Sequence, residues 1–267
     1  MEYIDSHFHL DIMEGKGVDV ATLCRTLPEE GWRGGIHVCT DPRRWREALR
    51  YPDLHPRIRL AVGAYPSLCE EDHSLLVSHL KEALSDPAFV AIGEIGLDFF
   101  RSYGTKEAQI ALFRTQLLLA RETGHPVILH LREAFREAIS LLDEMPPPPG
   151  GIAHCFSGGP EEAEALLERG FYISFAGTLT YPRNHDLRDA ARATPLSAIL
   201  VETDSPYLAP QPVRGTVNHP GTIPHIIEAL ASLKGLSPEE TASHIMSNYQ
   251  RFLDRVPPPS EPPTLHH

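Results

Sequence analysis

Short apolar runs alternate with longer amphipathic segments along most of the chain. Eight runs are near-continuously apolar, and most are rich in β-branched or aromatic residues; they span 3–10, 35–39, 58–64, 89–95, 126–131, 151–156, 171–176 and 198–202. Each has the length of a strand, and parallel strands that are covered on both faces have this apolar character. The pattern therefore predicts eight parallel strands joined by helices.

Two of the intervening segments carry clear helix boundaries. Segment 160–169 begins with Pro160 followed by two acids, and Gly170 ends it. Segment 105–123 carries apolar residues at three- and four-residue spacing, and Gly124 follows it. Proline in the first turn and glycine just past the end are typical of helices, so both segments are predicted to be helical.

The C-terminal part adds one more helix after the eighth strand and its crossover. Ser237-Pro238-Glu239-Glu240 is a capping box that opens a helix continuing toward Val256. The proline-rich stretch 257–267 is incompatible with helix or sheet and is predicted to be a flexible tail. We therefore expect a single domain over 1–256.

Eight strand-helix units favour a (β/α)8 TIM barrel with an extra C-terminal helix. A doubly wound open sheet shares the alternation, but 267 residues is an ordinary length for one closed barrel. Active-site groups of such barrels gather at the C-terminal ends of the strands, so the placement of ionisable residues helps to choose between the two folds.

Composition narrows the class of protein. The net charge of −12 argues against a broad basic surface for nucleic acid, although divalent cations can make a site locally positive on an acidic protein. The N-terminal residues lack the features of a signal peptide, and no run is long enough to span a membrane, so we expect a cytoplasmic protein. Four scattered cysteines fit reduced thiols, and nothing indicates an obligate protein partner.

Glu94 is the anomaly in this pattern. It lies among Ile92, Gly93, Ile95 and Gly96 in the fourth apolar run. A carboxylate buried there without a partner would be strongly destabilising, so the rest of the chain must supply a cation or hydrogen-bond donors.

Metal-type side chains lie at the ends of four other apolar runs. A lone histidine at a strand end is more often a hydrogen-bonded core residue than a ligand, but residues from several strands converge at the mouth of a barrel. Imidazoles and carboxylates without thiolates suit Zn²⁺, Mn²⁺ or another divalent ion, and six ligands are too many for one tetrahedral centre. We therefore expect two metals bridged by Glu94, with these ligands: His7, His9, Glu94, His130, His154 and Asp204.

Five motifs in this order resemble the TatD-type metal-dependent deoxyribonucleases, within the amidohydrolase-like metallohydrolases. They are Asp5-Ser6-His7-Phe8-His9-Leu10, Gly93-Glu94-Ile95-Gly96-Leu97-Asp98-Phe99, Pro126-Val127-Ile128-Leu129-His130-Leu131-Arg132, His154-Cys155-Phe156-Ser157-Gly158 and Glu202-Thr203-Asp204-Ser205-Pro206-Tyr207-Leu208. The resemblance implies one metal held by His7, His9, Glu94 and Asp204, and a second held by Glu94, His130 and His154. It also implies hydrolysis of DNA, often as an exonuclease.

The chain departs from the family pattern at two places. Tyr65 stands before Pro66 where the family usually has histidine, at a position suited to assist the substrate phosphate or leaving group. Thr216 and His219 stand where lysine and glutamate are common. The loss of the lysine weakens the case for tight polynucleotide binding and leaves other ester substrates open.

The expected mechanism is hydrolysis by a metal-activated water, with Asp204 as both ligand and proton acceptor. Asp98 is expected to orient a ligand or to structure its loop, with direct metal ligation as the alternative. Arg132 either contacts phosphate or begins the next helix with a solvated head, and Ser157 and Arg214 are further phosphate candidates. Two rivals remain: a hydrolase of the same fold acting on a small phosphoester, lactone or amide, and a non-catalytic binding module.

Overall fold

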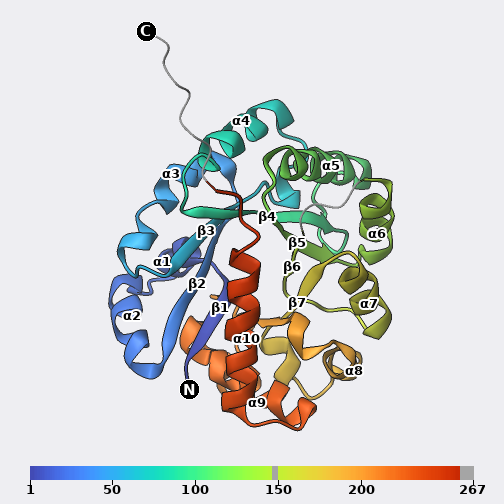
Figure 1. The fold of residues 1–267 in the computed structure, drawn as a ribbon. Coiled ribbons are helices and arrows are strands. Elements are labelled where there is room, and N and C mark those ends of the chain that lie inside the picture. Colours follow the sequence, from blue (N-terminus) through green and yellow to red (C-terminus); the bar gives the residue numbers. More distant parts are fainter. Residues whose placement is uncertain (146–149, 259–267) are drawn as a thin grey trace.

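Eight parallel strands form one sheet in the chain order β1 to β8, surrounded by helices (Figure 1). The structure, a computed structural model, describes residues 1–145 and 150–258. The strands are β1 (Tyr3–Phe8), β2 (Trp32–Cys39), β3 (Ile58–Val62), β4 (Phe89–Asp98), β5 (Val127–Arg132), β6 (Gly151–Ala153), β7 (Phe171–Phe175) and β8 (Ile199–Val201).

The α-helices fill the connections between these strands and follow the last one. They are α1 (Leu10–Gly15), α2 (Val20–Thr26), α3 (Trp45–Ala48), α4 (His73–Ala83), α5 (Lys106–Thr123), α6 (Phe135–Glu144), α7 (Pro160–Glu168), α8 (His185–Ala193), α9 (Ile223–Lys234) and α10 (Pro238–Leu253). The helices predicted from segments 105–123, 160–169 and 237–256 are confirmed as α5, α7 and α10. Ser237 caps α10 through the expected box with Glu240.

The first and last strands meet, which closes the sheet into a barrel. A parallel bridge joins Phe8 to Ser205, and the backbone nitrogen of Asp204 donates to the carbonyl of His7 at 3.0 Å. The predicted (β/α)8 barrel is therefore confirmed, and the open sheet is excluded. The domain limits of 1–256 stay a prediction, because most of the tail expected over 257–267 lies outside the described residues.

Some strand boundaries differ from those expected. β4 continues three residues beyond Ile95, because Leu97 and Asp98 still pair with β5. β1 ends at Phe8, so His9 lies at the start of α1 rather than inside the strand. β6 ends at Ala153, so His154 follows the strand. These differences leave the candidate ligands at the C-terminal end of the barrel.

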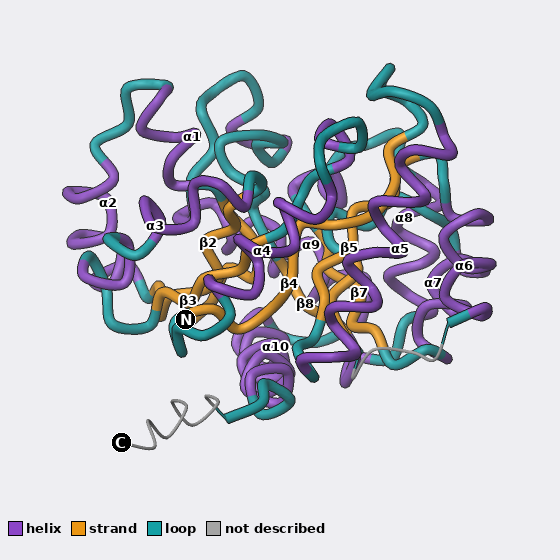
Figure 2. The backbone as a smooth tube through the Cα atoms, turned by 90° about the horizontal axis from the view of Figure 1, so that it is seen from above, coloured by secondary structure: helices purple, strands orange, loops and turns teal. Residues whose placement is uncertain are grey.

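Helix α10 covers the opposite, N-terminal end of the barrel. The side-chain amide of Asn248 donates to the carbonyls of Leu196 and Ile199 at the start of β8, and Phe252 packs edge-on against Tyr172 in β7. Figure 2 shows α10 below the strands, with loops at the other end. The candidate ligands lie at the other end of the barrel, where the strands finish. Among the described residues, we find no helix with the length and apolarity needed to cross a membrane.

Candidate metal centre

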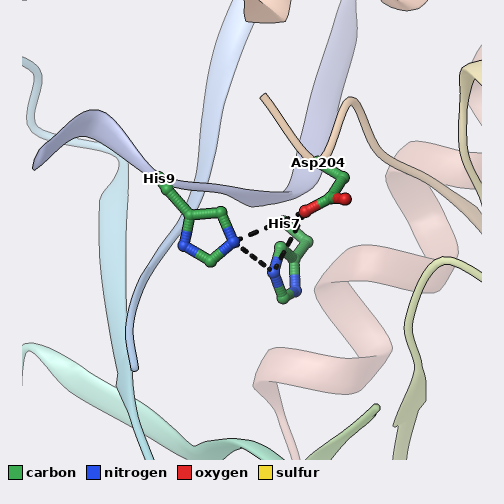
Figure 3. Close-up of side chains that lie close together, drawn as sticks. All are labelled: His7, His9 and Asp204. Atoms are coloured by element: carbon green, nitrogen blue, oxygen red, sulfur yellow. Dashed lines mark hydrogen bonds and ion pairs between the residues drawn. The ribbon is translucent and has the colours of Figure 1, made fainter. Parts of the chain in front are cut away.

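One group of potential ligands comes from the C-terminal ends of β1 and β8, the strands that close the barrel (Figure 3). Nε2 of His7 lies 3.1 Å from Nε2 of His9, and Oδ1 of Asp204 lies 3.9 Å from the former and 3.4 Å from the latter. Asp204 has a left-handed backbone (φ 51°), held by its own N–H to the His7 carbonyl. The three side chains converge on one point at the mouth of the barrel.

A second group comes from β4, β5 and the residue after β6. Oε1 of Glu94 lies 2.6 Å from Nδ1 of His130 and 2.9 Å from Nε2 of His154. The same two histidine nitrogens are 3.3 Å apart. These atoms can therefore face a common cation.

Glu94 belongs to both groups. While Oε1 faces His130 and His154, Oε2 lies 3.5 Å from Nε2 of His7 and 3.9 Å from Nε2 of His9. The residue is only 3% exposed, as its apolar sequence context implied. Its two oxygens thus point to the two groups separately, which is the arrangement of a bridging carboxylate.

Glycines around Glu94 let the strands approach closely enough for this arrangement. A Cβ on Gly96, whose φ is +143°, would lie 2.1 Å from the carbonyl oxygen of His130. A Cβ on Gly93 would lie 2.5 Å from the side chain of Ile128. β4 and β5 also shift register between Gly93 and Ile95. The glycines on either side of Glu94 are therefore required by the contact with β5.

The charges of the buried groups are strongly coupled. Burial raises the pKa of Glu94, but the positively charged forms of His154 and His130 outweigh burial and hold the pKa well below its usual range. Burial lowers the pKa of His154, but Glu94 and Glu202 outweigh it and raise the pKa well above the ordinary value. The carboxylates therefore favour positive charge in this site, which bound divalent cations would supply.

In three of the four histidines, the ring nitrogen that points away from the centre contacts a carbonyl or carboxylate oxygen. Nδ1 of His9 donates to the carbonyl of Val38 at 2.9 Å. Nδ1 of His154 lies 2.9 Å from Oε1 of Glu202, and Nε2 of His130 lies 3.3 Å from Oδ2 of Asp98. Such partners fix the tautomer and orientation of metal-binding histidines. The donor set and its supports therefore fit divalent metal.

Asp98 lies where an orienting residue was expected, behind His130. Its Oδ1 also accepts from the backbone nitrogens of Phe100 and Arg101, at 3.1 and 2.9 Å. Asp98 thus makes both kinds of contact expected of it: it contacts a candidate ligand and it structures the following loop.

Two buried acids for which the sequence predicts no role support the centre. Glu202, 0% exposed, contacts His154 and accepts from the backbone nitrogen of Cys155 at 2.7 Å. Asp5 accepts from the backbone nitrogens of His7 and Thr203, at 3.2 and 2.9 Å, and so ties β1 to the segment after β8. The signal that pointed to Glu94, a carboxylate in an apolar run, also exists for Glu202 in Ile199-Leu200-Val201-Glu202.

The substrate candidates lie in different settings. Arg132 ends β5 and stacks on Phe100, so it does not begin the next helix. Arg214 stacks on Tyr181 in the loop after β8. Ser157 is exposed after β6.

Tyr65, by contrast, lies beside the second group of ligands. Its hydroxyl is 3.3 Å from Oδ2 of Asp98 and 3.2 Å from Nε2 of His130. Tyr65 therefore contacts a candidate ligand and that ligand's orienting carboxylate.

Comparison with protein families identifies one match that spans nearly the whole chain. The family model described as TatD related DNase matches residues 4–254. The chain is 34% identical over 256 residues to YcfH of Escherichia coli strain K12, named an uncharacterized metal-dependent hydrolase, covering 95% of this chain and 96% of YcfH. It is 37% identical over 202 residues to the protein of Erwinia billingiae named 3′-5′ ssDNA/RNA exonuclease TatD, covering 73% and 77% of the two chains.

A solved structure shows the same architecture. The crystal structure of YjjV, a TatD homologue from Escherichia coli K12, superposes with a TM-score of 0.87 at 30% sequence identity. The match covers 96% of this chain and 98% of YjjV. Sequence and structure comparisons thus agree on one family.

Proposed function

The chain belongs to the TatD related DNase family of metal-dependent hydrolases, and from that premise we propose that it hydrolyses phosphodiester bonds of DNA with two divalent cations. His7, His9, Glu94 and Asp204 would hold one cation, and Glu94, His130 and His154 the other. Zn²⁺, Mn²⁺ and Mg²⁺ are the candidates, since all the donors are imidazoles and carboxylates.

The observation that carries this proposal is the orientation of Glu94. Oε1 lies within 2.9 Å of nitrogens from His130 and His154, while Oε2 faces His7 at 3.5 Å. A single-metal site would use one of these groups, whereas a carboxylate directed at both suits two metals. Paired cations of this kind are typical of phosphodiester hydrolysis.

When bound, the cations supply Lewis-acid chemistry: they lower the pKa of a water molecule and neutralise charge on phosphoryl oxygens. The chain's own residues supply the proton transfer and the geometry. Only Oδ1 of Asp204 makes the contacts with His7 and His9, so Oδ2 is left to accept a proton from the attacking water (Figure 3). Glu202 and Asp98 keep His154 and His130 in the orientation that directs their other nitrogens at the centre.

DNA as the substrate, and degradation from an end, rest on the resemblance and on the relatives. The Erwinia billingiae protein carries the name of a 3′-5′ ssDNA/RNA exonuclease. The net charge of −12 is compatible with such a substrate only if positive charge is concentrated at the site.

The test combines metal analysis with a nuclease assay. Metal content is measured first, and degradation of single-stranded DNA is then followed with Mg²⁺, Mn²⁺ or Zn²⁺ for the wild type and Asp204→Asn. We expect the variant to lose at least about 100-fold in turnover, as removal of a general base does. Asp189→Asn is the matched control, because Asp189 pairs with Arg192 on the exposed face of α8. Unchanged DNA turnover in Asp204→Asn would refute the role given to Asp204.

A hydrolase for a small phosphoester, lactone or amide is the second candidate. It is favoured by Tyr65, whose ring centroid lies 5.0 Å from that of His130 at the position where the family usually has histidine. A panel that compares single-stranded DNA with bis(p-nitrophenyl) phosphate, a lactone and an amide separates the candidates. DNA turnover below that of every small ester would favour the second.

A further inference from the structure

We propose that three cation–aromatic pairs at the mouth of the barrel bind the nucleotides on either side of the scissile phosphate of a single-stranded polynucleotide. The inference rests on the proposed function and adds to it the residues that bind the strand. The pairs are Arg132 with Phe100, Lys16 with Tyr207, and Arg214 with Tyr181. We call them the mouth pairs.

The first mouth pair lies where β4 and β5 end. The guanidinium carbon of Arg132 lies 3.8 Å from the centroid of the Phe100 ring, and that of Arg101 lies 5.8 Å from it. Phe100 is nevertheless 53% exposed, a large value for a phenylalanine. Asp98 fixes the turn that presents this ring, because its Oδ1 accepts from the backbone nitrogen of Phe100 at 3.1 Å.

The other two mouth pairs lie in loops after β1, β7 and β8. Nζ of Lys16 lies 4.7 Å from the centroid of Tyr207, which is 43% exposed. The Tyr207 ring is also 6.4 Å from the ring of His9, so this pair borders the metal centre directly. The guanidinium carbon of Arg214 lies 4.5 Å from the centroid of Tyr181.

The order of the strands places the Arg132–Phe100 pair and the Lys16–Tyr207 pair on opposite sides of the centre. In a closed barrel of order β1 to β8, the junction of β4 with β5 faces the junction of β8 with β1. Phe100 and Arg132 follow the former junction, and Tyr207 and Lys16 follow the latter. The ligands of both groups lie between them, so a chain that crosses the mouth meets an aromatic ring, the metal centre and a second ring in turn.

The chemistry of the pairs fits a single strand. Exposed aromatic rings and guanidinium planes stack on base faces, and the same cations contact phosphates. A duplex presents its base faces only to neighbouring bases, so it does not offer them to these rings. The buried position of Glu94, only 3% exposed, likewise requires the phosphate to reach into the mouth, which a flexible strand does more readily.

The binding experiment uses the metal-loaded protein and a fluorescent oligodeoxythymidine with phosphorothioate linkages, which resist hydrolysis, so that binding is read without cleavage. Phe100→Ala and Tyr207→Ala are each expected to weaken binding about tenfold, as loss of one stacked base does. The matched control is Arg255→Ala, which removes a cation stacked on Tyr172 beside the N-terminal end of the barrel, and it should bind as the wild type does. Equal affinities of wild type, Phe100→Ala and Tyr207→Ala would overturn the proposal.

An abasic oligonucleotide separates stacking from a general effect of the substitutions. The wild type should bind it about tenfold more weakly than the thymidine strand, whereas Phe100→Ala should show a smaller difference, because the ring that recognises the base is already missing. If the affinity ratio between the thymidine and abasic strands is the same in the two proteins, the rings pack only against their own cationic side chains and do not contact bases.

Kinetics then distinguish this inference from the proposed function. In Phe100→Ala and Tyr207→Ala, the KM for the oligonucleotide should rise about tenfold more than the KM for bis(p-nitrophenyl) phosphate. If neither substrate is hydrolysed by the wild type, the proposed function fails, while the binding experiment still tests the mouth pairs. If both are hydrolysed and the variants lose both equally, the mouth pairs are not strand subsites.

Discussion

Oε1 of Glu202 lies 2.9 Å from Nδ1 of His154 and 2.7 Å from the backbone nitrogen of Cys155. The carboxylate therefore holds both the side chain of a candidate ligand and the backbone that carries it. Glu202 follows β8 directly and His154 follows β6, so the contact links the ends of the two strands on either side of β7.

Glu202→Gln should lower metal affinity about tenfold, because the amide keeps the shape of the side chain but loses the charge that strengthens His154 as a ligand. Competition with a chromophoric chelator measures this change. Glu228→Gln is the matched control: Glu228 lies 3.8 Å from His225 on the exposed surface of α9, and its loss should leave metal affinity unchanged. An affinity of Glu202→Gln equal to that of the wild type would show that the contact is only structural.

Glu94→Ala should remove metal from both groups, since its two oxygens face them separately. His154→Ala should mainly weaken the group that contains His130 and retain at least one equivalent of metal. Elemental analysis of the purified proteins gives the stoichiometry. Glu94→Gln repeats the test with a side chain of the same size, in case the alanine variant does not fold. Equal metal content in the Glu94 and His154 variants would contradict the bridge.

Tyr65→Phe tests the hydroxyl that lies beside the second group of ligands. The hydroxyl lies 3.2 Å from His130 and 3.3 Å from Asp98, so its removal should lower metal affinity only a few-fold, whereas Asp98→Asn should lower it about tenfold. Metal titration compares the two variants. A Tyr65→Phe protein that binds metal normally but loses turnover of a small phosphodiester would instead place the hydroxyl on the substrate.

Gly96→Ala should both destabilise the fold and disturb the centre. The added Cβ would lie 2.1 Å from the carbonyl oxygen of His130, so β4 and β5 must separate, and we expect a loss of about 3 kcal/mol or more in the free energy of unfolding. Gly235→Ala is the control, because Gly235 also has a left-handed backbone but nothing lies within 4 Å of an added Cβ. This variant should lose about 1 kcal/mol in the free energy of unfolding. Denaturant unfolding with metal analysis reads both effects. Similar losses in the two variants would show that the close contact is unimportant.

The pattern of apolar runs predicted much of the fold. All eight runs became strands, because a parallel strand covered on both faces must be apolar along its length. The sequence predicted strand ends less well where pairing with a neighbouring strand decides the last residue. β4 extends to Asp98 because β5 offers it partners as far as Arg132, and no local feature of the sequence specifies that register.

The sequence by itself determined the barrel and the ionisable residues at its mouth. The C-terminal ends of the strands in such a fold lie around one mouth, regardless of the loops that connect them. Only the tertiary structure decided which atoms face one another. His130 faces Glu94 with its Nδ1, whereas His154 faces it with its Nε2. The difference arises because Asp98 contacts Nε2 of His130 and Glu202 contacts Nδ1 of His154. Those contacts join residues more than 30 positions apart, and their geometry depends on the closure of the barrel rather than on local spacing.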